Sequence, residues 1–231
     1  MINKIKVRED TVLSDILLFR EMKLDKINLL SGPNGSGKST LINHLMYYWT
    51  HTKESGLELE YDRPMELYTY INSKNNLRYA DKNPDISYAD LCRPNIQLMR
   101  LACQSMSEGQ SIMYSMSDML NGLTEIPFND EKDVLVVFDE MDSGLSVDNI
   151  DYIMNKVLDI SEVRSDVQFV ISFNNYAVCR KYTRIKSMMT GGTLEMMSYN
   201  QFYKFISSNH NIILSKRNRN MFTGEILGNG Y

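Results

Sequence analysis

The sequence is poor in cysteine, and the three cysteines that it has show no pairing or metal-binding pattern. Cys92, Cys103 and Cys179 lie far apart, with no CxxC motif and no cysteine–histidine spacing typical of zinc sites. This usage is typical of a reducing compartment, in which cysteines are buried free thiols. The cysteines therefore predict neither a disulfide framework nor a metal site.

Long apolar runs and an excess of positive charge are also absent. No 18-residue apolar run is present, and the chain does not open on the charged-then-apolar pattern of a signal peptide. The formal net charge is −4, so no overall basic field attracts nucleic acid or membrane. The one basic cluster, Lys216, Arg217 and Arg219, is interpreted as part of a solvated tail. We expect a cytoplasmic protein without membrane insertion.

The 231 residues are enough for one sizeable domain and few for two. Alternating and continuous apolar patterns predict strands at residues 2–7, 12–19, 26–30, 66–71, 133–138 and 167–172. Helical spacing predicts helices from Lys38, from Ser107 and across 147–158, and 184–199 reads as a hairpin about Gly191 and Gly192. Residues 51–65 are predicted to be a loop and 72–97 an irregular segment. Because strands alternate with helices, the predicted class is α/β.

The stretch LLSGPNGSGKST, Leu29 to Thr40, is the strongest motif in the chain. It follows an apolar strand, precedes a helix and matches the complete P-loop pattern, which is the context that a P-loop requires. Glycine-rich backbone wraps phosphates, the lysine neutralises them and the following serine holds Mg²⁺. The predicted nucleotide-binding residues of this loop are Asn34, Gly35, Ser36, Gly37, Lys38, Ser39 and Thr40, with Ser39 also a metal ligand.

A second acidic motif follows the strongest predicted strand. The run VLVVFDE places Asp139 and Glu140 at the end of a strand that is predicted to be buried on both faces. A P-loop enzyme needs a carboxylate for Mg²⁺ at the end of such a neighbouring strand, so Asp139 is the predicted metal ligand. Glu140 is the predicted catalytic residue that accepts a proton from the attacking water.

These motifs together resemble the ABC-type ATPases. GPNGSGKST is similar to their Walker A motif, and VVFDEMDSGL is similar to their Walker B motif and D-loop. The resemblance implies a P-loop fold with a mostly parallel central sheet, flanking helices and a smaller antiparallel β part. It also implies ATP and Mg²⁺ as cofactors and Glu140 as the catalytic base. The D-loop would comprise Ser143, Gly144, Leu145 and Asp148.

The resemblance extends to a signature-like segment, MSEGQ, between the two Walker motifs. Ser107, Gly109 and Gln110 match the family's LSGGQ pattern, which contacts the ATP bound to the other subunit. Two features depart from the family. Asn174 stands where the switch histidine is expected, and no glutamine lies between Lys38 and Gln97. The residue proposed in place of the missing glutamine is one of Asn72, Asn75 or Asn76.

The branch of the family is suggested by what the chain does not contain. Only 69 positions separate Lys38 from Ser107, and such a segment is short for the helical subdomain of a transporter subunit. The segment DEMDSGLS more closely resembles the SMC, RecF and RecN proteins. Arg20 resembles the basic loop that those proteins place before Walker A. Their coiled-coil and nuclease insertions are missing, so the chain resembles an ATPase head alone.

The expected function is an ATP-driven dimerisation switch. Two copies would enclose two Mg-ATP molecules, and a protein partner in DNA processing or in phage or bacterial defence is expected by resemblance. DNA itself is left open as a partner. The expected head domain covers residues 1–205, with a C-terminal extension at 206–231. Two alternatives are the ATP-binding subunit of a membrane transporter and a nucleotide-gated binding module with very slow hydrolysis.

Overall fold

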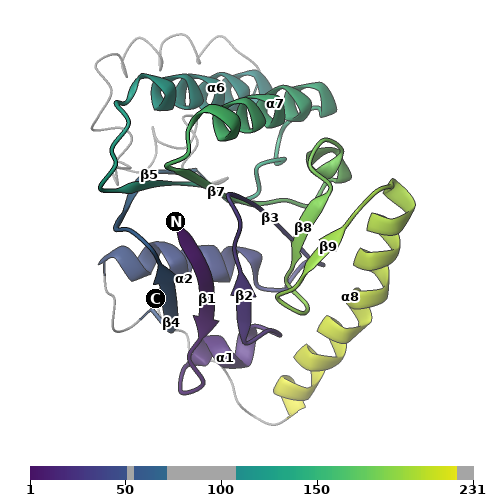
Figure 1. Ribbon diagram of the computed structural model, residues 1–231. Helices are drawn as coiled ribbons and strands as arrows, with labels where there is room; N and C mark the ends of the chain where they lie inside the picture. Colours follow the sequence, from purple (N-terminus) through teal and green to yellow (C-terminus); the bar gives the residue numbers. More distant parts are fainter. Residues whose placement is uncertain (51–54, 72–107, 223–231) are drawn as a thin grey trace.

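A six-stranded sheet forms the centre of the structure, a computed structural model that describes residues 1–50, 55–71 and 108–222 (Figure 1). Neighbouring strands are parallel throughout, except that the last two strands in the order are antiparallel to each other. The strand order is β5 (Met65–Ile71), β6 (Asp133–Phe138), β7 (Val167–Ser172), β3 (Ile27–Ser31), β8 (Arg184–Ser187) and β9 (Thr193–Glu195).

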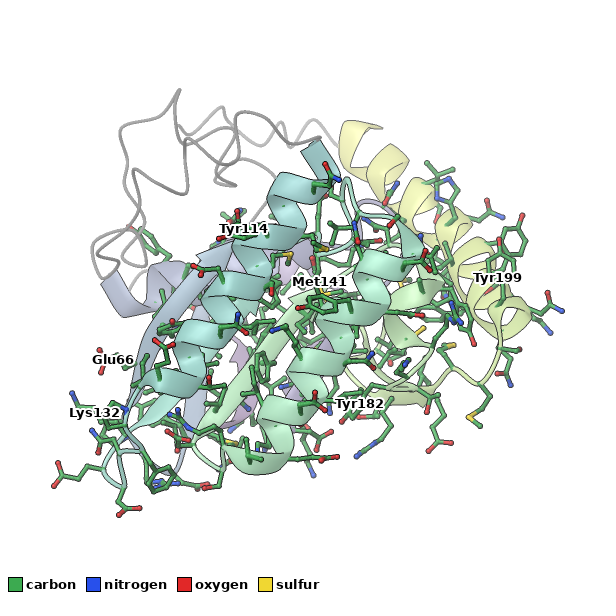
Figure 2. The ribbon with its side chains drawn as sticks, turned by 90° about the horizontal axis from the view of Figure 1, so that it is seen from above. Glu66, Tyr114, Lys132, Met141, Tyr182 and Tyr199 are labelled. Atoms are coloured by element: carbon green, nitrogen blue, oxygen red, sulfur yellow. The ribbon has the colours of Figure 1, made fainter. Side chains whose placement is uncertain are left out.

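Both faces of this sheet are buried, which explains the continuous apolar runs of its central strands. In β6, Val136 and Phe138 belong to one hydrophobic cluster, and Leu135 and Val137 to another. The first cluster lies under α6 (Glu108–Glu125) and α7 (Val147–Val163). Figure 2 looks down on these two helices, which run side by side over the sheet.

The second cluster is covered by a smaller β part and two helices. A three-stranded antiparallel sheet has the order β2 (Glu21–Lys23), β1 (Ile2–Val7) and β4 (Leu57–Tyr61). With α1 (Val12–Ile16) and α2 (Lys38–Thr50) it supplies the side chains that pack on this face (Figure 1). The predicted fold class, a mostly parallel sheet with flanking helices and a small antiparallel part, is confirmed.

Two predictions of local structure are wrong. Residues 12–19 are not a strand: α1 forms there because Leu13 and Leu17, four residues apart, both turn into the core. Residues 51–65 are not wholly a loop, since β4 pairs with β1 and sets Leu57 opposite Val7. In both segments the apolar pattern is too short to fix the secondary structure, which is determined by tertiary contacts.

The chain beyond the hairpin of β8 and β9 forms one long helix, α8 (Tyr199–Phe222). Its buried Phe202 stacks on Phe173 at 5.9 Å between ring centroids and meets Tyr176 at 5.8 Å. The division into a head at 1–205 and an extension at 206–231 stays a prediction, and α8 continues across residue 205. The side chains of the basic cluster at 216–219 and the irregular segment at 72–97 lie outside the described residues.

The free cysteine among the described residues, Cys179, is buried in the short helix η1 (Tyr176–Cys179). Its burial raises the pKa of the thiol to about 12, so the group is a protonated core side chain at neutral pH. This agrees with the expectation of a buried free thiol at that position.

Within the ranges 1–50, 55–71 and 108–222, no helix has both the length and the apolar character needed to span a bilayer.

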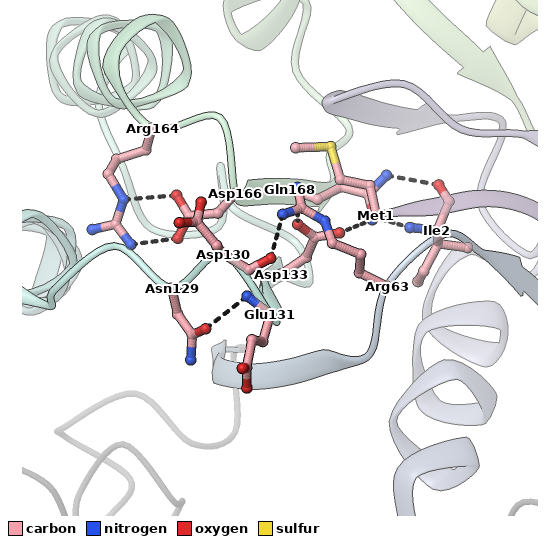
Figure 3. A network of polar contacts seen from close by, with 10 residues as sticks. All are labelled: Met1, Ile2, Arg63, Asn129, Asp130, Glu131, Asp133, Arg164, Asp166 and Gln168. Carbon is pink, nitrogen blue, oxygen red and sulfur yellow. Dashed lines mark hydrogen bonds and ion pairs between the residues drawn. The ribbon is translucent and has the colours of Figure 1, made fainter.

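A network of buried charges ties together the amino ends of β6 and β7 (Figure 3). Arg164 donates from Nε and Nη2 to the two carboxylate oxygens of Asp166, at 2.8 and 2.7 Å. Its Nη1 also donates to the carbonyl oxygens of Leu123 and Ile126 at the end of α6. The pair therefore joins the helix layer to the strand that follows.

Gln168 and Asp133 extend this network to β1. Gln168 Oε1 accepts from the Ile2 amide at 2.9 Å, and Gln168 Nε2 donates to the Ile2 carbonyl at 2.9 Å. Asp133 is fully buried and pairs with the amino group of Met1. Its Oδ1 lies 3.1 Å from Arg63 Nη2, close enough for an ion pair although not aligned as a hydrogen bond.

Candidate functional site

The loop between β3 and α2 has the backbone of a phosphate-binding loop. Gly35 and Gly37 have φ of 81° and 91°, in the left-handed region that glycine adopts without strain. A Cβ on Gly37 would lie 2.6 Å from Leu17 Cδ2, and one on Gly32 would lie 2.6 Å from Ser36 Oγ. Gly37 is thus favoured both by its backbone conformation and by the close approach of Leu17, whereas Gly32 is favoured by close contacts alone.

Lys38 begins α2 and is nearly buried, at 7% exposure. Its Nζ donates to the Gly32 carbonyl at 2.7 Å, so the ammonium lies back across the loop. Burial lowers the pKa of Lys38, and the carboxylates of Asp142, Glu140 and Asp139 offset part of that effect. A buried cation held by one carbonyl is well placed to exchange that contact for a phosphate oxygen.

The next residue, Ser39, meets the carboxylate predicted to share its metal. Ser39 Oγ donates to Asp139 Oδ1 at 3.1 Å, although the two residues are 100 positions apart. Asp139 is buried and its Oδ1 accepts a second bond from Ser172 Oγ at the end of β7. The structure thus brings together the two predicted metal ligands, and their coordination of Mg²⁺ stays a prediction.

The donor set fits Mg²⁺ bound together with a nucleotide. No group of three or more His, Cys, Asp or Glu side chains within residues 1–50, 55–71 and 108–222 could hold a metal by itself. One hydroxyl and one carboxylate match the usual Mg²⁺ site, which takes its other ligands from water and substrate phosphates. The buried hydroxyls of Ser31 and Ser36 have no partner among the described residues, which leaves donors in the loop for phosphate oxygens.

Glu140, the predicted base, is held in an unusual backbone conformation. It is the one non-glycine residue in the described part of the chain with positive φ, at 55°. Its amide donates to Ser172 Oγ at 2.8 Å, and the Met141 amide donates to the Ser172 carbonyl at 3.0 Å. Strained residues that are fixed in this way cluster at functional sites.

Asn174 follows β7 and is exposed, close to the same strand ends. Its amide and that of Asn175 donate to Asp142 Oδ2, at 2.9 and 2.5 Å. Burial raises the pKa of Asp142, and the two amide bonds and the charge of Lys38 act in the opposite direction. The predicted position for a γ-phosphate sensor is therefore tied to the loop that carries Glu140.

Other predicted site residues lie around this centre or beyond the described chain. Asn34 and Gly35 are exposed at the loop tip, and Thr40 is half-buried in the first turn of α2. Ser107 and the proposed asparagines at 72, 75 and 76 lie outside the described residues. Gly109 and Gln110 begin α6.

The start of α6 packs against the predicted D-loop. A Cβ on Gly109 would lie 2.6 Å from the Gly144 carbonyl oxygen, so only glycine fits there. Gly144 itself has φ of 75°. Beyond it, Leu145 packs on the core, while Ser143 and Asp148 are exposed. Gly109 of the signature-like segment is therefore a neighbour of Gly144 in the predicted D-loop.

Two polar residues of the site were not predicted from the sequence. Ser172 bridges Asp139 and Glu140, and Asp142 holds the loop after β7. A signal for Ser172 was present, because it is a polar residue at the carboxyl end of a strand whose neighbours are apolar. Asp142 had no such signal, since acidic residues near a turn are common on surfaces.

A separate hollow of about 340 Å³ lies between β9 and α8. None of the predicted site residues lines it. Its walls are formed by Leu194, Glu195, Met196, Gln201, Lys204, Phe205, Ser208 and Asn209.

No family model matches the sequence, and no curated protein matches it either. Among solved structures, Stu0660 of Streptococcus thermophilus is similar, with a TM-score of 0.51 and 12% identity over 87% of this chain and 78% of that one. An ATP-binding cassette of an ABC transporter has a TM-score of 0.48 and 16% identity, over 94% and 99% of the two chains.

A third similar structure is cbiO1 from Clostridium perfringens, described as part of the ABC transporter complex cbiONQ. Its TM-score is 0.48 and its identity 12%, over 96% of this chain and 99% of that one. At 12% identity the likeness to Stu0660 concerns the fold alone.

Proposed function

We propose that this chain is an ABC-type P-loop ATPase that binds Mg-ATP and acts as an ATP-driven dimerisation switch. The observation that carries the proposal is the contact of Ser39 Oγ with Asp139 Oδ1 at 3.1 Å, beside the buried ammonium of Lys38. Phosphate-binding loop, metal carboxylate and cation thus converge at one edge of the sheet, where open α/β sheets bind ligands.

Each residue has a defined task in this mechanism. Mg²⁺, when bound by Ser39 and Asp139, would neutralise the charge that develops on the phosphates. Lys38 would exchange the Gly32 carbonyl for a phosphate oxygen, and the amides of the loop and of the α2 N-terminus would hold the others. Glu140 would accept the proton of the attacking water, with its backbone fixed by Ser172.

The dimer part of the proposal is supported by the packing of Gly109 on Gly144. The start of α6 and the D-loop form one surface, which a second copy would face across an isologous interface. Ser107, Gly109 and Gln110 of one copy would then complete the ATP site of the other. We also propose a protein partner that processes DNA or acts in defence, on the resemblance of DEMDSGLS to the DNA-associated branch and of the chain to a bare ATPase head.

Light scattering on the Glu140→Gln protein, with and without Mg-ATP, tests this function. We expect the mass to double with Mg-ATP, because nucleotide binds and is not hydrolysed. The control is the Lys38→Ala, Glu140→Gln double variant, which should stay monomeric. A mass that stays constant while ATP binds would contradict the homodimer, and normal hydrolysis by Glu140→Gln would contradict the role of Glu140.

A steady-state ATPase assay addresses the partner. Faster turnover of the unmodified protein with double-stranded DNA would support a DNA-associated role, and an unchanged rate would remove DNA as a direct effector. Co-purification with a membrane protein would redirect the proposal to a transporter subunit.

A slow nucleotide-gated module is the second candidate. It is favoured by Asn174, an uncharged side chain at the position of the switch histidine, which is exposed beside the site. Such a module would dimerise with ATP in the unmodified protein and release it slowly. Single-turnover hydrolysis rates distinguish it from the first candidate.

A further inference from the structure

The loops that follow β6 and β7 are joined by one carboxylate. Asp142 Oδ2 accepts from two successive amides, Asn174 at 2.9 Å and Asn175 at 2.5 Å. Two successive N–H groups that converge on one oxygen form a concave anion site in the backbone. Here the anion comes from the chain itself, 32 and 33 positions away in sequence.

These loops carry the groups on which the proposed hydrolysis depends. Glu140 lies two residues before Asp142, and Asn174 is itself one of the donors. A first connection between the loops is made by Ser172, which meets the Glu140 amide. That connection ends at the last residue of β7, and the Asp142 contact extends the link between the two loops to Asn174 and Asn175.

The contact has features of a functional arrangement. Asp142 Oδ1 is buried and has no partner among the described residues, which is costly for a carboxylate. An unpaired oxygen alone does not define a site, because Asp151 Oδ1 on α7 has the same property. What distinguishes Asp142 is the pair of amides that it holds and its electrostatic interaction with Lys38.

We infer that Asp142 is a positioning residue: its carboxylate holds the Asn174–Asn175 backbone against the Glu140 loop and so orients both loops for hydrolysis. The two hydrogen bonds from these amides to Asp142 Oδ2 are called the clip. The inference deepens the proposed function and rests on it. Asp142 touches neither substrate nor metal in this account, and acts through Glu140 and Asn174. Removal of the clip should therefore lower kcat and leave nucleotide binding at the P-loop largely intact.

The test compares Asp142→Ala and Asp142→Asn with Asp151→Asn, whose carboxylate pairs with Arg180 at 3.5 Å. We expect kcat to fall about 100-fold in Asp142→Ala, the usual cost of a misplaced reacting group, with KM for ATP within about threefold. Asp142→Asn keeps one acceptor oxygen for the two amides and should recover part of the rate. Asp151→Asn should match the unmodified protein.

Hydrogen exchange at the Asn174 and Asn175 amides supplies a readout that does not depend on turnover. Loss of their acceptor should speed exchange about tenfold in Asp142→Ala, and Asp151→Asn should have no effect there. Unchanged exchange would overturn the clip. A kcat of Asp142→Ala near that of the unmodified protein would overturn the positioning role. A rise in KM for ATP as large as the fall in kcat would overturn it as well.

The failure of the proposed function has a different outcome from the failure of this inference. If the unmodified protein neither binds nor hydrolyses ATP, both are overturned. If it hydrolyses ATP and Asp142→Ala does so equally well, only the inference is lost. Should Asp142→Ala not fold, Asp142→Asn together with its exchange rates decides the question.

Discussion

The two ends of the central strands use buried polar residues in opposite ways. At the amino ends, Arg164 makes two bonds to Asp166 and two to backbone carbonyls, and Gln168 bridges to β1. At the carboxyl ends, Ser31, Ser36 and Asp142 keep buried oxygens without partners among the described residues. At the amino ends Asp133 Oδ1 also lacks a hydrogen bond, but it lies 3.1 Å from Arg63 Nη2, within ion-pair distance. The amino ends therefore use their polar groups for contacts within the chain, while the carboxyl ends offer donors and charges to a ligand.

The same contrast appears in two lysines on either side of β3. Lys26 precedes the strand and donates to the Ser161 carbonyl, and Lys38 follows the P-loop and donates to the Gly32 carbonyl. Burial lowers the pKa of both. They differ in their surroundings: three carboxylates act on Lys38, whereas Asp166 alone acts on Lys26. The lysine before β3 thus connects two structural elements, while the lysine after β3 belongs to the proposed ligand site.

The largest effect on ligand binding in this comparison is expected for Lys38→Ala. Loss of the ammonium should weaken ATP binding at least about 100-fold, or ~2.7 kcal/mol, because no other cation of the loop replaces it. Thermal stability should not fall, since burial of a lysine is itself unfavourable. Titration with a fluorescent ATP analogue and thermal melting measure the two quantities.

Lys26→Ala is the matched control. It should bind ATP within about twofold of the unmodified protein, because its contact lies at the other end of β3. Equal loss of binding in the two variants would break the proposed division between the strand ends.

The next effect concerns stability at the amino ends. Arg164→Ala leaves Asp166 buried and unpaired, so we expect a loss of about 3–5 kcal/mol in the free energy of unfolding. Denaturant unfolding measures it. The control, Arg180→Ala, removes an ion pair that is half-exposed, and should cost no more than about 1 kcal/mol. KM for ATP should be unchanged in both variants.

The pH dependence of this loss checks its cause. Arg164 holds the pKa of Asp166 below its ordinary 3.8, so the pair stabilises the fold fully above that pH. The stabilisation is lost as the pH falls through the lower folded-state pKa. The difference between Arg164→Ala and the unmodified protein should therefore shrink in strong acid, and a difference that is independent of pH would argue against the ion pair.

The smallest effect is expected for Ser172→Ala at the carboxyl ends. The hydroxyl joins Asp139 and the Glu140 amide, so its loss should lower turnover about tenfold by loosening the site. Unfolding free energy should fall by only about 1 kcal/mol, the net worth of an ordinary hydrogen bond. Steady-state kinetics and denaturant unfolding measure both.

Ser187→Ala is the control for this variant. Ser187 is also buried at the end of a strand of the same sheet, but within the described part of the chain its hydroxyl accepts only from the Met189 amide. A loss of turnover in Ser187→Ala as large as in Ser172→Ala would show that any buried serine at this edge matters.

The site was predictable where chemistry depends on residues close together in sequence. The loop of glycines before Lys38 and Ser39 and the acidic pair after β6 were both visible as patterns. The segment at 12–19 was not, because a short apolar pattern fits a strand or a helix until its packing partner is known. β4 was missed for the same reason, since its pairing with β1 joins residues that are fifty or more positions apart in the sequence.

The sequence by itself determined the α/β class, the P-loop and the identity of the carboxylates near it, because these follow from local periodicity and spacing. Only the tertiary structure decided that Ser172 would connect Asp139 with Glu140, and that Asp142 would hold the Asn174 loop. The physical reason is that parallel strands bring their carboxyl ends to one edge. Which polar groups meet there depends on strand order and register, which no local pattern records.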